Sequence, residues 1–171
     1  MHARSRLLHS IVYLVEPRRW RSWQHCYWSL YLLDFSVYGQ LGRSVTGLDY
    51  VATPTGPSPE ALCRELEAPA PDLAASIAIT NLVLDGDHLV RTAYPLIHFQ
   101  PEKFTTCELT MLYDLGCRCH VNGSFVLDER TYLPHEPWRR ALEREQSRRP
   151  APIRYVAANQ LPMALPEPGW S

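Results

Sequence analysis

The first apolar residues of the chain recur with the period of an α-helix. The residues of this stripe are Leu7, Ile11, Leu14 and Val15. Ser5 before the stripe suits a helix N-cap, and Pro17 after it cannot continue a helix. The pattern therefore predicts a helix that ends before Pro17 and buries one face.

A second and longer helix is predicted from about residue 18 to residue 38. Its first half is amphipathic, and its aromatic side carries Trp20, Trp23 and Tyr27. Its second half is apolar on nearly every side, which is typical of a central helix packed by neighbours all round. Gly39 and Gly42 provide the signals that end it.

Asp34 is the one acid in the apolar half of this helix. An unpaired carboxylate in such a place costs several kcal/mol, so we expect Asp34 to face an edge or to have a partner. The hydroxyls of Ser36 and Thr46, the amides of the following loop, or an arginine could serve. A structural brace that fixes this loop is favoured over a catalytic carboxylate.

The next segment predicts a loop over residues 41–57, in which residues 50–53 can form a short strand. Ser58 is placed to cap a third helix that runs to about Leu66. Alternating alanine and proline over residues 68–71 then predicts a stiff connector.

A hairpin is predicted where two β-type runs, 77–84 and 88–94, flank the sequence Asp85-Gly86-Asp87. Further along, Thr105 and Glu108 have the spacing of a capping box, in which each side chain bonds the other residue's amide. We expect a helix to begin there.

A last helix is predicted from Pro137 to about Arg149, and the proline-rich stretch 150–171 has no period. We expect this stretch to be a loosely ordered tail, from which Tyr155 could still dock on the domain or on a partner. The patterns together predict a mostly α fold, a single compact helical domain over residues 1–149 with a small β-hairpin.

Composition narrows the classes of function. The chain has 171 residues, 46% of them hydrophobic and 20% charged, which suits one globular domain. A net charge of −1 makes a nucleic-acid partner unlikely. The longest apolar run is too short and too polar to span a membrane. The five cysteines cannot all pair, so we expect a reduced chain in the cytoplasm.

One group of residues could carry chemistry. It consists of Cys107, Cys117, Cys119 and His120. Zinc sites use such ligands, but no second Cys/His pair follows at finger spacing, and His135 stands alone. We therefore expect no metal, no cofactor and no catalytic residue. A metal- or thiol-dependent hydrolase that uses this group is the alternative.

Several short motifs follow one another in a recognisable order. The first half contains Leu30, Tyr31 and Asp34, then Gly42, Val45, Thr46 and Gly47, then Tyr50 and Ala52, and then Gly56 and Pro57. The second half contains Thr105 and Glu108, and then His135, Pro137 and Trp138. This order, over about residues 7 to 143, resembles the Panacea domain, the SocA-like family of bacterial and phage antitoxins.

The resemblance implies a protein that neutralises a cognate toxin by direct protein–protein contact, without being an enzyme. Some members of the family also hand the toxin to a protease, so a protease is a second partner that the resemblance implies. Others belong to prophages. Candidates for contact with the toxin are Trp20, Trp23 and Tyr27, although packing on the first helix would explain these aromatic residues equally well.

Overall fold

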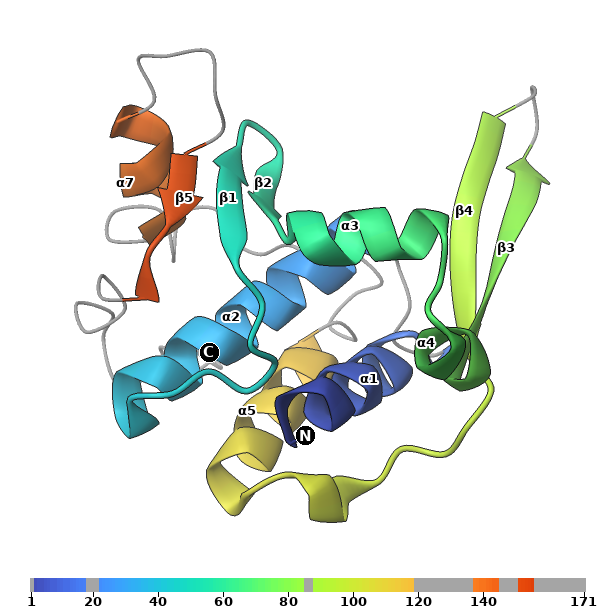
Figure 1. The fold of residues 1–171 in the computed structure, drawn as a ribbon, viewed down its shortest axis with the longest axis horizontal. Coiled ribbons are helices and arrows are strands. Elements are labelled where there is room, and N and C mark those ends of the chain that lie inside the picture. The colour runs from blue at the N-terminus through green and yellow to red at the C-terminus, as the bar shows by residue number, and fades with distance from the viewer. Residues whose placement is uncertain (1, 18–21, 85–87, 119–136, 145–150, 156–171) are drawn as a thin grey trace, which may run out of the picture.

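The computed structural model describes residues 2–17, 22–84, 88–118, 137–144 and 151–155 (Figure 1). The predictions for Trp20, Cys119, His120 and His135 lie outside the described residues. In Figure 1, helix α2 (Trp23–Leu41) runs through the middle of the molecule. Helices α1 (His2–Leu14) and α5 (Thr106–Arg118) lie below it. A three-stranded sheet lies at one end, and the β3–β4 hairpin lies at the other.

Helices α1 (His2–Leu14) and α2 (Trp23–Leu41) supply much of the core. The stripe predicted for the first helix is buried at Leu7, Ile11, Leu14 and Val15. From α2 the core receives Leu30, Leu33, Phe35 and Val37. Burying a side chain of this size contributes roughly 1.5–3 kcal/mol, so both helices contribute substantially to the stability of this part of the fold.

Helix α2 begins and ends later than the predicted range 18–38. The Oγ of Ser22 accepts a hydrogen bond from the His25 amide at 3.2 Å, which caps the first turn. At the other end, Gly42 has φ 67° and its amide donates to the Tyr38 carbonyl at 2.9 Å. Glycine adopts this left-handed conformation without steric cost, and the chain turns back there.

The three-stranded sheet has the order β2-β1-β5, and both pairings are antiparallel. Its strands are β1 (Tyr50–Thr53), β2 (Gly56–Ser58) and β5 (Ala151–Ile153). In the central strand, Val51 lies opposite Ser58 on one side and Pro152 on the other. Pro152 is tolerated because it stands on an outer strand.

The elements between the two sheets are α3 (Glu60–Glu67), α4 (Pro71–Ser76), β3 (Ile77–Leu84) and β4 (His88–Pro95). Strands β3 and β4 pair antiparallel, with Ile77 opposite Pro95 and Leu84 opposite His88. The predicted hairpin is thereby confirmed, and its turn lies outside the described residues.

Arg4 connects the N-terminal helix to α3 and α4. Its Nη1 donates to Glu65 Oε2 and its Nε donates to Asp72 Oδ2, both at 2.8 Å. This guanidinium lowers the pKa of the Asp72 carboxyl to about 2. The network holds the base of the hairpin close to α1, because α4 leads directly into β3.

After the hairpin come η1 (Pro101–Lys103), α5 (Thr106–Arg118) and α7 (Pro137–Arg144). The capping box at the start of α5 is confirmed. The amide of Thr105 donates to Glu108 Oε2 at 2.7 Å, and the amide of Glu108 donates to Thr105 Oγ1 at 3.4 Å. Within α5, a Cβ at Gly116 would lie 2.5 Å from the Tyr13 hydroxyl oxygen, so glycine allows α1 to approach closely.

The prediction of a mostly α domain with one small hairpin is wrong. The structure combines helices with two antiparallel sheets. Strand 50–53 was anticipated, but its two neighbours were not. Strand β2 reads Gly-Pro-Ser, which has low intrinsic strand propensity, and β5 comes from the stretch assigned to a loose tail. Pairing with β1, across a short turn for β2 and from a remote segment for β5, overrides these local preferences.

Candidate functional site around Asp34

The residues of the sequence motifs converge on Asp34, whose side chain is completely buried. Its Oδ1 accepts hydrogen bonds from the amides of Val45 at 2.8 Å and Thr46 at 2.7 Å. Its Oδ2 accepts from the Thr46 hydroxyl and from the Tyr50 hydroxyl, the latter at 2.8 Å. Of the partners predicted for Asp34, the Thr46 hydroxyl and the loop amides are confirmed.

The backbone between α2 and β1 brings these donors to the carboxylate. Gly42 reverses the chain after α2, and Gly47, with φ 74°, turns it again after Thr46. The Thr46 Oγ1 also accepts from the Leu48 amide at 3.3 Å, and Arg6 Nε donates to the Val45 carbonyl at 3.0 Å. The loop is thus fixed from both of its ends and from α1.

Tyr155 completes the cluster from beyond β5. Its ring stacks on Phe35 with 4.6 Å between the ring centroids. Its hydroxyl donates to the Leu48 carbonyl, and the same oxygen lies 3.4 Å from Asp34 Oδ2. Of the two alternatives open for Tyr155, docking on the domain is the one observed. We call Asp34, Val45, Thr46, Tyr50 and Tyr155 the Asp34 cluster.

Burial raises the pKa of the Asp34 carboxyl from 3.8 to about 6, and the hydrogen bonds from Thr46, Tyr50 and Val45 oppose this rise. Burial and the nearby Asp34 raise the pKa of the Tyr50 phenol well above its usual value. Tyr50 therefore remains a donor at neutral pH. Because both carboxylate oxygens are occupied by groups of the protein, this arrangement is suited to bracing the loop against α2.

A second group of motif residues lies beside the cluster, where α2, the sheet and α7 meet. The Trp138 amide donates to the Tyr31 hydroxyl at 3.1 Å, and Trp138 Nε1 donates to the Thr53 carbonyl at 3.0 Å. The rings of Trp28 and Trp138 are 5.2 Å apart. These contacts attach α7 to the edge of the Asp34 cluster, since Tyr31 also packs on Tyr50.

Gly56 and Pro57 lie buried where β2 passes over α2. Gly56 has φ 135°, and a Cβ there would lie 2.5 Å from Trp28 Nε1 and 2.8 Å from Gln24 Nε2. Glycine is therefore required at this position for two reasons, the backbone conformation and the lack of space.

Glu108 is a further buried charged residue, and the sequence predicts only some of its contacts. The capping box was anticipated, but the arginines were not. Arg43 Nη1 lies 2.6 Å and Arg6 Nη1 lies 3.6 Å from Glu108 Oε1. Burial opposes ionisation of Glu108, but the Thr105 amide and the two arginines outweigh it and lower the pKa of its carboxyl. Arginines in a helix and a loop resemble solvated surface residues, so no sequence signal marks this pairing.

The other predicted candidates occupy separate places. Trp23 and Tyr27 are half-buried on α2, and their ring centroids are 6.2 Å apart. Cys107 is half-buried, and its thiol donates to Gln40 Oε1 at 3.1 Å. Cys117 belongs to the last turn of α5. Among the described residues, no three metal-ligating side chains gather at one point.

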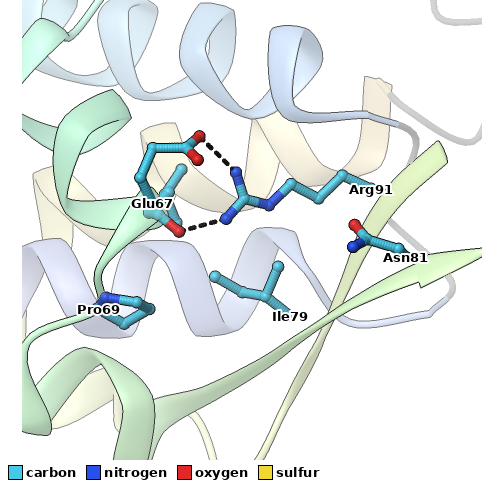
Figure 2. Close-up of a pocket in the computed structure, with 6 residues that line it drawn as sticks. Glu67, Pro69, Ile79, Asn81 and Arg91 are labelled. Atoms are coloured by element: carbon cyan, nitrogen blue, oxygen red, sulfur yellow. Dashed lines mark hydrogen bonds and ion pairs between the residues drawn. The ribbon is translucent and has the colours of Figure 1, made fainter. Parts of the chain in front are cut away.

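A cavity of about 480 Å³ lies between the end of α3 and the hairpin (Figure 2). It is lined by Leu66, Glu67, Pro69, Ile79, Asn81 and Arg91. Arg91 Nη1 pairs with Glu67 Oε1 at 2.7 Å, and its Nη2 donates to the Leu66 carbonyl. Arg91 therefore attaches β4 to the C-terminal end of α3, away from the Asp34 cluster.

No protein-family model, curated protein or solved structure matches the chain. The similarity to the Panacea domain accordingly depends on the order of the motifs and on the residues that carry them. Within the described residues, no helix is both long enough and apolar enough to cross a membrane.

Proposed function

We propose that this protein is an antitoxin-like binding protein that neutralises a cognate toxin by direct protein–protein contact. Its setting would be a bacterial or phage toxin–antitoxin system, and a protease that receives the toxin would be a second partner. The observation that carries the proposal is the convergence of separate sequence motifs on one cluster. Asp34, Thr46 and Tyr50 come from different motifs and share one set of hydrogen bonds.

The Asp34 cluster supports a role as a scaffold for binding. Its polar side chains satisfy one another, and it joins α2, the following loop, β1 and Tyr155, which lies beyond β5. A surface carried by such a pre-organised body loses less conformational entropy when a partner binds. Direct binding is the mode of action that the resemblance implies.

We place the contact with the toxin on an exposed apolar segment that consists of Tyr94, Leu96 and Ile97. These side chains are 44%, 53% and 38% exposed. Large apolar side chains that remain in water are typical of partner-binding surfaces. Trp23 and Tyr27, the candidates from the sequence, are already half-covered by the domain.

The cytoplasm is the compartment that we propose. Five cysteines cannot all form disulfides within one chain, and Cys26, Cys63 and Cys107 are free thiols in the structure. Free thiols persist in a reducing compartment.

Co-expression with the neighbouring gene tests this proposal. We expect that gene to arrest growth when it is expressed alone, and growth to resume when this protein is produced with it. The two proteins should then co-purify as a complex. A neighbouring product that is harmless alone, or a rescue without any complex, would contradict neutralisation by direct binding.

Metal analysis separates this proposal from the hydrolase alternative, which would use Cys107, Cys117, Cys119 and His120. We expect the purified full chain to contain far less than one equivalent of zinc. We also expect Cys107→Ser to leave toxin neutralisation intact. Stoichiometric zinc that this substitution removes would favour the hydrolase.

A further inference from the structure

Strand β3 has a second edge that no described strand covers. It pairs with β4 on one side, and the described residues place nothing from the other sheet beside it. In Figure 1 the hairpin extends away from the helices, with β3 on its outer side. An uncovered edge offers a row of backbone donors and acceptors to another strand.

The hydrogen-bonding phase of the hairpin determines which backbone groups point outward. The Leu96 amide donates to the Ser76 carbonyl at 2.9 Å, which continues the register of the hairpin by one pair. Because hydrogen-bonded pairs alternate along an antiparallel ladder, the even-numbered residues of β3 bond to β4. The odd-numbered residues therefore direct their amides and carbonyls to the outer edge.

Helix α4 covers only the beginning of this edge. The Ile77 amide donates to the Leu73 carbonyl. The outward-facing groups that follow belong to Ile79, Asn81 and Val83, and Asn81 is exposed to solvent. These three residues form the part of the edge that another strand can reach.

Strand β3 also lacks the features that usually protect an edge. Its sequence, Ile-Ala-Ile-Thr-Asn-Leu-Val-Leu, has no charge, no proline and no glycine. Strand β4 differs, since it carries Arg91 and ends at Pro95. An uncharged edge has no repulsion against an identical edge, so a second copy of this strand is compatible with it.

We propose that two copies of this protein associate through antiparallel pairing of their β3 strands, with the two-fold axis at Asn81. A two-fold axis perpendicular to the sheet keeps the same face of each hairpin on the same side. Asn81 then lies opposite its copy, and Ile79 lies opposite Val83. In this register the outward amides and carbonyls of these residues all find partners.

The proposed register also matches side-chain chemistry. Asn81 meets an identical amide side chain, which can both donate and accept hydrogen bonds. The residues on either side of the axis are apolar or carry a hydroxyl, so no like charges meet. The contact is small, and it therefore forms a weak and reversible dimer.

Sedimentation of the full chain tests this proposal over a concentration range from micromolar to millimolar. We expect the average mass to rise from monomer to dimer. Amide hydrogen exchange at Ile79, Asn81 and Val83 should slow as the protein concentration increases. A chain that stays monomeric throughout would overturn the proposal.

Asn81→Asp provides a specific variant. It places two like charges across the axis, and we expect it to weaken association by about fivefold or more. Inside each hairpin the new carboxylate would lie opposite Arg91, so folding should be retained. Thr92→Asp is the matched control, because it adds the same charge to β4, and it should still dimerise. Equal dimerisation of Asn81→Asp and the wild type would rule out this interface.

Discussion

The Asp34 carboxylate is fully buried, and Val45, Thr46 and Tyr50 all donate hydrogen bonds to it. Asparagine in its place would keep the shape but would turn N–H groups towards the Val45 and Thr46 amides, or towards the hydroxyls of Thr46 and Tyr50. The loop after α2 would then lose its attachment. The contribution of Asp34 as a brace can therefore be measured as a change in the free energy of unfolding when the residue is replaced.

We expect Asp34→Asn to lower the free energy of unfolding by roughly 2–4 kcal/mol, since a charged acceptor is lost and buried donors are left opposed. Urea denaturation at neutral pH measures this change. Asp49→Asn is the control, because Asp49 is exposed on the same loop and should change stability by less than about 0.5 kcal/mol. Equal effects of the two substitutions would show that Asp34 is not a brace.

The pKa of Asp34 predicts a distinctive pH dependence. Its folded-state pKa is about 6, above its ordinary value of 3.8, so the folded state binds the proton more tightly. The stabilisation that protonated Asp34 provides is therefore present at low pH, and it is lost as the pH rises from about 4 to 6. A shift of about two units corresponds to roughly 3 kcal/mol.

The difference in unfolding free energy between wild type and Asp34→Asn isolates this contribution. We expect the difference to shrink as the pH is raised over that range. Asp72, and Glu108 likewise, act with the opposite sign, because their pKa values are lowered in the folded state. Their contributions are common to both proteins and cancel. A difference that instead grows with pH would show that the hydrogen bonds outweigh burial.

At the scale of the element, two glycines separate two reasons for requiring glycine, which are backbone conformation and lack of space for a Cβ. Gly42 ends α2 with φ 67°, and a Cβ there would meet nothing within 4 Å. Gly56 has φ 135°, and its Cβ would collide with Trp28. Gly42 is needed only for its left-handed backbone conformation. Gly56 is needed for its backbone conformation and also because the absence of a Cβ allows β2 to pack on α2.

We expect Gly42→Ala to cost about 1–2 kcal/mol, the usual cost of the left-handed conformation for a residue with a Cβ. Gly56→Ala should cost clearly more, because Trp28 has to move as well. Thermal melts of the two variants provide the comparison, with Gly42→Ala as the internal control. A smaller loss for Gly56→Ala would mean that β2 can shift at little cost.

Several elements could be predicted from the chain alone. The stripe from Leu7 to Val15, the Asp-Gly hairpin signal and the Thr105–Glu108 box depend on neighbours a few residues apart, and each corresponds to an observed element. Strands β2 and β5 could not be predicted in this way. Strand β2 follows β1 after a short turn, but its Gly-Pro-Ser sequence has low strand propensity. Strand β5 pairs with β1 from about a hundred residues away, so no local pattern contains that pairing.

At the scale of the whole molecule, the proposed function depends on which surface of the folded domain is free to contact the toxin. The exposed apolar segment lies at the end of β4, since Tyr94 belongs to that strand and Leu96 and Ile97 come directly after it. If this segment contacts the toxin, a charge there should abolish binding without loss of stability, since its side chains are exposed.

We expect Leu96→Asp and Ile97→Asp each to weaken the complex with the toxin at least tenfold, as buried charges at an interface do. Titration calorimetry with the purified toxin measures this change, and melting curves check the fold. Ala74→Asp on exposed α4 is the control and should bind normally. If Tyr27→Asp alone were to abolish binding without unfolding the chain, the contact would belong to α2 instead.

The chain by itself determined the helical stripe, the hairpin and the need for a partner at Asp34, because periodicity, turn chemistry and the cost of a buried charge act over short distances. Only the tertiary structure decided which donors serve Asp34, that Tyr155 joins them from beyond β5, and that Arg6 and Arg43 share Glu108. These contacts depend on packing between segments that are remote in the sequence. Because the groups are buried, leaving any of them without a partner would be costly.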